Sequence, residues 1–187
     1  MTFDEIVHTR RSIRAYDTAR SVPAEHLLSM VEAARWAPSA CNSQTWRFTV
    51  VTERALLDRI CSEAMQPILP NRWLRTAPAI IAGASDRAPI ANRVGGAISG
   101  IDYYQIDLGI AMEHMVLKAV ELGLGTCWIG WFRTRPLKKI LGIPHRMKVL
   151  ALLAVGYPAP QEPSNQKRKT LKEIASWNRW GTPPPDA

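Results

Sequence analysis

The stretch VLALLAVG, residues 149–156, is a continuous apolar run without the polar alternation of a strand that faces water on one side. Such a run is typical of a strand covered on both faces. Shorter strand-like segments occur at 46–52 (WRFTVVT), 77–85 (APAIIAGAS) and 125–132 (GTCWIGWF). The run at 149–156 therefore predicts a sheet that lies between two layers of helices.

A long helix is expected at residues 103–122, where apolar residues recur at helical spacing. They cover more than a narrow stripe, so we expect burial on two sides, in the core or at a dimer interface. Gly123 follows at the position where a glycine commonly ends a helix. The apolar positions are Ile106, Ile110, Met112, Met115, Val116, Ala119 and Val120.

Further helices are interleaved with the strands. Residues 22–39 place Leu27, Val31 and Ala34 on one face, and Pro38 is the expected stop. Residues 53–64 and 135–143 also have helical spacing, whereas 88–100 lacks periodicity and predicts an irregular connection. The alternation predicts an α/β (α+β) fold.

The length of 187 residues predicts a single domain that can bury a core without disulfides. After Gly156 the composition becomes rich in proline and polar residues, which predicts an extended C-terminal arm over 158–187. Within the arm, apolar residues recur every three positions, more than a disordered tail needs. They are Leu171, Ile174, Trp177 and Trp180.

The net charge of +8 would suit a nucleic-acid or membrane-surface protein, but the 24 basic residues are spread along the chain. The cysteines, Cys41, Cys61 and Cys127, are odd in number and lack zinc-site spacing, which indicates a reducing compartment. No uncharged apolar stretch of about 18 residues is present. We therefore expect a soluble, cytoplasmic protein.

No self-sufficient catalytic motif is present: GxSxG, HExxH, GxxxxGK[ST] and GxGxxG after a strand are all missing. His114 lies within the long predicted helix and is expected to be a satisfied core or interface residue. If the protein is an enzyme, a cofactor is expected to bring the chemistry.

The segment RRSIR, residues 10–14, concentrates three arginines near the start of the chain. A nucleic-acid patch, a solvated basic face and a phosphate site are the three interpretations. Exposed aromatics or a known binding module, which a nucleic-acid surface would need, are not evident. We favour the phosphate, because forked guanidinium donors and the Ser12 hydroxyl suit a phosphate monoester.

A second polar segment, APSACNSQTWRF at 37–48, joins a predicted helix to a strand. Its small polar residues could simply cap the helix and turn the chain. Its amide side chains could also read the edge of a planar heterocycle, which presents alternating donors and acceptors.

Taken together, RRSIR, PSACNSQTWRF, LGLGTCWIGWF, AVGYPA and RKTLKEI, in this order over residues 3 to about 175, resemble the successive motifs of the nitroreductase family of flavoproteins. The resemblance implies a three-layer α-β-α sandwich with a central mixed sheet. It also implies a homodimer in which the C-terminal arm is exchanged.

The resemblance further implies a site for flavin mononucleotide (FMN). The first motif would hold its phosphate and ribityl end, and Arg14 or Arg72 could place a cation near the ring. The second motif would read its pyrimidine edge, often from the partner subunit, with Thr45 where the family usually has proline. Trp128, Ile129 and Gly130 would supply main-chain contacts. The implied contacts are Arg10, Arg11, Ser12, Arg14, Pro38, Ser39, Asn42, Gln44, Trp128, Ile129, Gly130 and Arg168, with Gln166 at the family's late lysine position.

The implied activity is that of an FMN-dependent oxidoreductase. A reduced donor, NADH or NADPH, would pass a hydride to flavin N5, and nitroaromatics, quinones or similar acceptors would then take the electrons. Ferredoxin stays open as a donor, and neither nucleic acid nor membrane is expected as a partner. The alternatives are a flavin-based dehalogenase, a flavin-remodelling enzyme, or a non-catalytic flavin-binding or redox-sensing module.

Overall fold

The protein is built around a four-stranded sheet with strand order β1-β2-β4-β3. The computed structural model describes residues 1–68, 71–86, 100–160 and 166–185. The strands are β1 (Trp46–Val51), β2 (Ala79–Asp86), β3 (Gly125–Ile129) and β4 (Met147–Gly156). β4 pairs with β2 on one side and with β3 on the other, so the most apolar strand lies inside the sheet.

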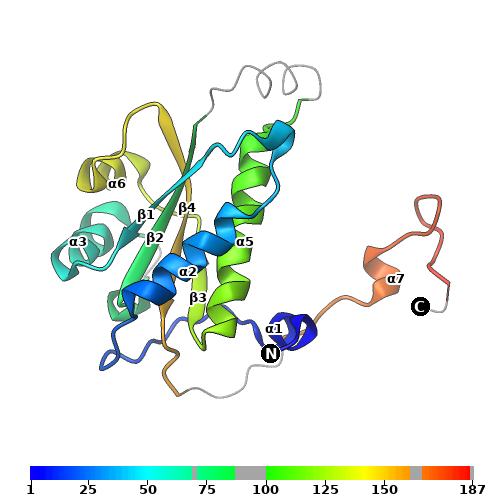
Figure 1. Ribbon diagram of the computed structural model, residues 1–187, viewed down its shortest axis with the longest axis horizontal. Coiled ribbons are helices and arrows are strands. Elements are labelled where there is room, and N and C mark those ends of the chain that lie inside the picture. The colour runs from blue at the N-terminus through cyan, green and yellow to red at the C-terminus, as the bar shows by residue number, and fades with distance from the viewer. Residues whose placement is uncertain (69–70, 87–99, 161–165, 186–187) are drawn as a thin grey trace.

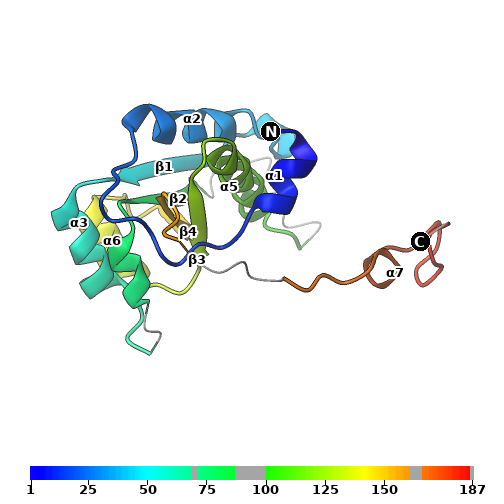
Figure 2. The same cartoon turned by 90° about the horizontal axis from the view of Figure 1, so that it is seen from below.

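Helices cover both faces of this sheet (Figures 1 and 2). One face packs against α2 (Ala24–Arg35) and α5 (Tyr103–Glu121). The opposite face packs against α3 (Arg54–Arg59), the π-helical turn Ile60–Ala64 that continues it, and α6 (Thr134–Leu141). The remaining helical segments are α1 (Phe3–Thr9), the 3-10 turns Ala40–Asn42 and Arg72–Thr76, and α7 (Leu171–Ile174).

The prediction that 149–156 is covered on both faces is confirmed. Leu152 and Ala154 belong to the core under α3 and α6, whereas Leu153 and Val155 belong to the core under α2 and α5. All four side chains are fully buried. The alternation of a strand thus sends apolar residues into two cores at once.

The sheet was predicted to be mixed, but its four strands pair antiparallel throughout. The parallel pairing that the described residues contain is an isolated bridge between Ser12 and Thr126. The segment after Ser12 does not continue as a strand because Ile13 and Tyr16, three positions apart, both enter the same core. A strand would send them to opposite faces.

Helix α5 confirms the predicted long helix but is buried on one side only in the single chain. Its inner face, with Leu108, Met112 and Met115, packs into the core. Ile106 is 49% exposed, and Ile110 and Val120 are half-buried, so burial of the second side at a dimer interface stays a prediction. The helix ends as predicted, with Gly123 in the left-handed region at φ +72°.

The C-terminal arm stands away from the sandwich (Figures 1 and 2). Its apolar residues Leu171, Ile174, Trp177 and Trp180 are exposed, although they lie on α7 and an ordered turn closed by the bond from Trp177 N–H to Thr182 O. The irregular connection predicted at 88–100 lies, apart from Gly100, outside the described residues.

Candidate functional site

The arginine-rich segment runs along the edge of β3. The Ile13 N–H donates to Thr126 O at 2.8 Å, and Ser12 forms the parallel bridge to the same residue. A glycine at position 125 permits this approach, because a Cβ there would lie 2.5 Å from Ile13 Cγ1. Gly125 in β3 thus allows the segment that carries the arginines to pack against this strand.

A pocket of about 380 Å³ opens beside this contact. It brings Arg14 together with the predicted main-chain contacts Trp128, Ile129 and Gly130. Asn71, Trp73, Cys127 and Trp131 complete its lining. Aromatic walls, a guanidinium, an amide and strand-end backbone groups are the donor set that suits a planar, polar-edged ring.

Asn71 and Trp73 were missed by the sequence reasoning, which considered Arg72 instead. They lie at the start of the 3-10 turn before β2, and only the tertiary structure carries that turn to β3. The Arg72 side chain is exposed and is not part of the pocket lining. The cation at this pocket is therefore Arg14.

Glu113 on α5 is a further unpredicted residue of this region. Burial raises the pKa of this carboxyl above its ordinary range, while the Arg10 guanidinium, a hydrogen bond with Trp128 and His114 act in the opposite direction. Glu113 therefore lies near both Arg10 of the first motif and Trp128 of the third. It sits one residue before His114, whose ring contacts Ala33 O at 3.2 Å, as expected of a satisfied packing histidine.

Cys127 lies in the floor of the pocket as a buried thiol. Burial raises its pKa, and the adjacent Arg14 guanidinium opposes that rise through charge and a hydrogen bond. The thiol is consequently neutral near pH 7, and the positive charge of Arg14 is not cancelled by a thiolate.

Arg11 differs from Arg10 and Arg14 in its surroundings. Its guanidinium Nη1 donates to the carbonyl oxygens of His8 and Arg10 (2.8 Å to the latter), where α1 ends. Lysine and arginine side chains commonly satisfy the last carbonyls of a helix in this way. Its predicted contact with phosphate stays a prediction.

The second motif forms a tight loop before β1. Gln44 N–H donates to Ser39 Oγ at 3.0 Å, and Gln44 Nε2 donates to Asn42 Oδ1 at 3.0 Å. Cys41, Asn42 and Gln44 have φ of +52°, +51° and +44° although none is glycine. Such residues cost about 1–3 kcal/mol each and persist where surrounding contacts impose them.

Thr45 fixes the end of this loop by hydrogen bonds to β2. Its hydroxyl accepts a hydrogen bond from Ser85 Oγ at 2.7 Å, and its carbonyl accepts one from Asp86 N–H at 3.1 Å. Both partners lie on β2, and Thr45 is buried. A hydroxyl thus does by hydrogen bonding what a proline would do by restricting φ.

The predicted site residues fall into separate groups within one chain. The second motif, with Pro38, Asn42 and Gln44 exposed, lies beside the N-terminal end of α5, where Ala40 N–H donates to Asp107. The first motif follows α1, which lies toward the opposite end of α5 (Figure 1). Arg168 lies on the projecting arm, with Nη2 donating to Gln166 Oε1 at 2.6 Å.

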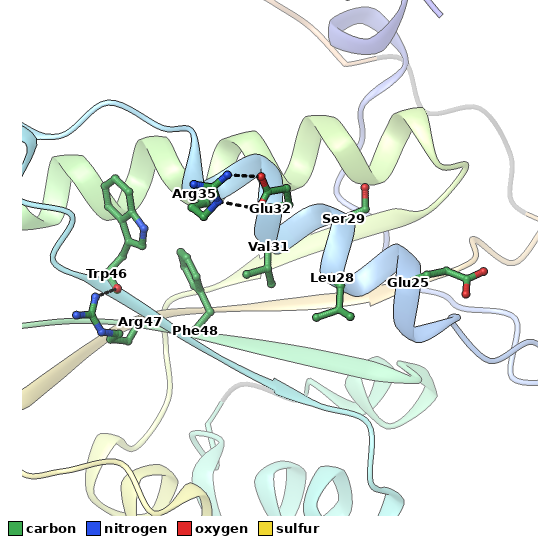
Figure 3. A pocket seen from close by; sticks show the side chains of 9 residues that line it. All are labelled: Glu25, Leu28, Ser29, Val31, Glu32, Arg35, Trp46, Arg47 and Phe48. Carbon is green, nitrogen blue, oxygen red and sulfur yellow. Dashed lines mark hydrogen bonds and ion pairs between the residues drawn. The ribbon is translucent and has the colours of Figure 1, made fainter.

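Figure 3 shows a larger pocket, of about 600 Å³, between α2 and the edge strand β1. Leu28 and Val31 point from α2 toward the strand, and Phe48 points back toward the helix. Glu32 at its rim is paired with Arg35 at 2.6 Å. The lining shares no residue with the pocket at Arg14.

Comparison with known proteins decides the family. The family model described as "Nitroreductase family" matches residues 7–157, which include the first three motifs and the pocket. The chain belongs to the nitroreductase family. The predicted resemblance and the three-layer sandwich are confirmed, because solved nitroreductases share the fold over nearly the whole chain.

Three nitroreductase-family relatives are informative. A protein of Archaeoglobus fulgidus, named for NADH dehydrogenase and NAD(P)H nitroreductase, is 34% identical to this chain. The match covers 84% of this chain and 86% of the relative. Iodotyrosine deiodinase 1 of Rattus norvegicus is 30% identical, over 92% of this chain and 68% of its own. A Desulfovibrio desulfuricans nitroreductase solved with FMN has a TM-score of 0.79 at 27% identity, over 96% and 98%.

Two further observations concern this member of the nitroreductase family. Within the described residues, no helix is long and apolar enough to cross a membrane. Nor does the described part of the chain gather a group of His, Cys, Asp or Glu suited to a metal ion.

Proposed function

We propose that this chain is an FMN-dependent oxidoreductase whose flavin ring occupies the pocket at Arg14. The observation that carries the proposal is the meeting of Arg14, from the first motif, with Trp128–Gly130 of the third in one pocket. Membership of the nitroreductase family and the FMN complex of a relative support it. The names of relatives support NADH or NADPH as donor.

When bound, FMN would supply the redox chemistry that couples oxidation of NADH or NADPH to reduction of a nitroaromatic, quinone or similar acceptor in a ping-pong sequence. With FMN in this pocket, the positive charge of Arg14 would favour addition of negative charge to the ring. The Asn71 amide and main-chain groups of Trp128–Gly130 would contact the polar edge of the ring. Trp73, Trp128 and Trp131 line the same pocket and would offer aromatic surface to the ring.

For the phosphate end we propose Arg10 and Ser12 as the main contacts of the first motif. Both are half-buried next to β3, and Arg10 has Glu113 nearby as a counter-charge. A phosphate carries more negative charge than one carboxylate, so it can outcompete Glu113 for the guanidinium. Arg11, next to the end of α1, and Arg168, on the C-terminal arm, would add further positive charge to the phosphate site.

We further propose a homodimer, because one chain leaves the predicted site divided between the two ends of α5. Ile106, Ile110 and Leu117 form an exposed or half-buried apolar stripe on α5, and Phe3 and Val7 extend it on the adjacent α1. Pairing two α5 helices antiparallel would bring the Asn42–Gln44 loop of one copy toward Arg10–Arg14 of the other. The arm, with its exposed Leu171, Ile174 and Trp177, would wrap the partner.

A dehalogenase is the second candidate. The relationship to iodotyrosine deiodinase 1 favours it, as does a pocket with several tryptophans, which suits an aromatic substrate. The two candidates share the flavin and differ in the acceptor, so only turnover of each substrate class separates them.

The test begins with the purified protein and its visible absorbance. We expect a yellow protein, reduced anaerobically by NADH or NADPH and reoxidised by nitroaromatics or quinones. Reduced ferredoxin and halogenated phenols are parallel arms for the other donor and the second candidate. A colourless protein that cannot be reconstituted with FMN would overturn the proposal.

A further inference from the structure

The loop that carries Asn42 and Gln44 is fastened to the helical core at one buried residue. Asp107, near the start of α5, is only 3% exposed, and its Oδ1 accepts a hydrogen bond from Ala40 N–H at 3.0 Å. The other end of the loop is fastened to β2 through Thr45. Asp107 therefore sets where the loop starts relative to α5.

The loop needs such a constraint because its backbone is strained. Cys41, Asn42 and Gln44 all lie in the left-handed region. The bonds from Gln44 to Ser39 and Asn42 run within the loop, so they hold its shape without fixing its position. Only an anchor outside the loop can orient the exposed Asn42 and Gln44 side chains toward a ligand.

The bond from Ala40 to Asp107 is of the strong kind. Because Asp107 is buried, this hydrogen bond lies in a low-dielectric environment, where it is electrostatically stronger than in water. Among the residues that the structure describes, the second oxygen, Oδ2, is buried without a hydrogen-bond partner. An asparagine could therefore replace Asp107 and keep the one bond that is made.

We propose that Asp107 is a positioning residue for the cofactor, which holds the 39–44 loop so that Asn42 and Gln44 are pre-set to bind FMN. The proposal rests on the proposed function, since the loop is taken to read the flavin. Asp107 acts through the backbone of Ala40 and does not itself touch the flavin.

The first experiment needs no flavin. Amide hydrogen exchange of the flavin-free protein should show a protected Ala40 N–H in the wild type and in Asp107→Asn, and loss of that protection in Asp107→Leu. Leu108→Ala is the matched control, because Leu108 is equally buried on the same helix but packs near Gly83, away from the loop. Unchanged protection of Ala40 in Asp107→Leu would overturn the anchoring role, whatever the protein binds.

The second experiment titrates each flavin-free variant with FMN and follows quenching of flavin fluorescence and the visible circular dichroism of the bound ring. We expect Asp107→Leu to weaken binding about tenfold and to change the dichroism, and Asp107→Asn to stay within about twofold of wild type. Leu108→Ala should lower the melting temperature while FMN affinity is kept. Wild-type affinity in Asp107→Leu, or an equal loss in Leu108→Ala, would overturn the positioning role.

The two failures can be told apart. If the wild-type protein binds no FMN, the proposed function fails, and hydrogen exchange still decides whether Asp107 anchors the loop. If the wild type binds FMN and Asp107→Leu binds it equally well, the positioning role alone fails.

Discussion

Ile13 and Thr126 are joined by a hydrogen bond of 2.8 Å that brings the N-terminal arginines to the edge of β3. The contact unites the first and third sequence motifs, which lie far apart in the chain. It also places Arg14 beside Trp128–Gly130 in the candidate flavin pocket.

Gly125→Ala should destabilise the protein and weaken FMN binding. The added Cβ would lie 2.5 Å from Ile13 Cγ1 and 3.0 Å from Pro158 Cγ, so the arginine segment must shift from β3. Overpacking of this kind costs about 1–3 kcal/mol of unfolding free energy, measurable by urea denaturation. Gly109→Ala is the control, since no atom of the described residues lies within 4 Å of its added Cβ and a helix favours alanine. Equal effects at both positions would contradict the steric account.

Arg14→Ala should weaken FMN binding by at least about tenfold, because a charge-assisted contact with the ring is lost. Arg59→Ala removes an equal charge from an exposed ion pair with Glu63 on α3 and should leave FMN affinity unchanged. Flavin fluorescence titration measures both. If the two variants lose affinity equally, only overall charge matters and the pocket assignment is wrong.

Glu113→Gln should change how stability depends on pH. Burial raises the pKa of Glu113, so the folded protein holds this proton more tightly than the unfolded chain. The free energy of unfolding therefore falls as pH rises from the ordinary glutamate range through the raised pKa. Glutamine does not titrate, so the stability of Glu113→Gln relative to wild type should increase as the pH rises from the ordinary glutamate range through the raised pKa. Parallel pH profiles of the two proteins in urea denaturation would refute this.

Ile106→Asp should dissociate the proposed dimer without unfolding the chain. The side chain is 49% exposed on the outer face of α5, so a carboxylate is tolerated there in a monomer but not in an apolar interface. Light scattering after size-exclusion chromatography gives the mass of each species. Ile68→Asp, at a residue 88% exposed elsewhere, is the control. A wild-type monomer, or a dimer that persists in Ile106→Asp, would count against this interface.

Much of the fold follows from local pattern. The uninterrupted apolar run at 149–156 predicted a strand with two covered faces, and Leu152 and Leu153 enter opposite cores as that pattern requires. The ends of the helices also follow from single residues such as Gly123. The mixed sheet, which was expected from the family resemblance, was wrong for the single chain, because β1 to β4 all pair antiparallel and local pattern does not encode strand pairing.

The candidate site was predicted only in part. Arg14 and the backbone of Trp128–Gly130 could be named from their motifs, and the structure brings them together. Asn71, Asp107 and Glu113 carry no sequence signal of their own, because asparagine and acidic residues in helices and turns are ordinary. Their surroundings distinguish them, and those surroundings come from distant segments.

The sequence by itself thus determined the layered architecture, the order of the elements and the family. The reason is that apolar periodicity and the residues of each motif are local features, which can be read without knowing the tertiary contacts. The tertiary structure alone decided that Arg10 lies near Glu113, that Ala40 is held by Asp107 and that the two halves of the predicted site fall at opposite ends of α5. The physical reason is that such contacts depend on how closely whole elements approach. At Gly125 and Ile13, that approach is set by the absence of one side chain.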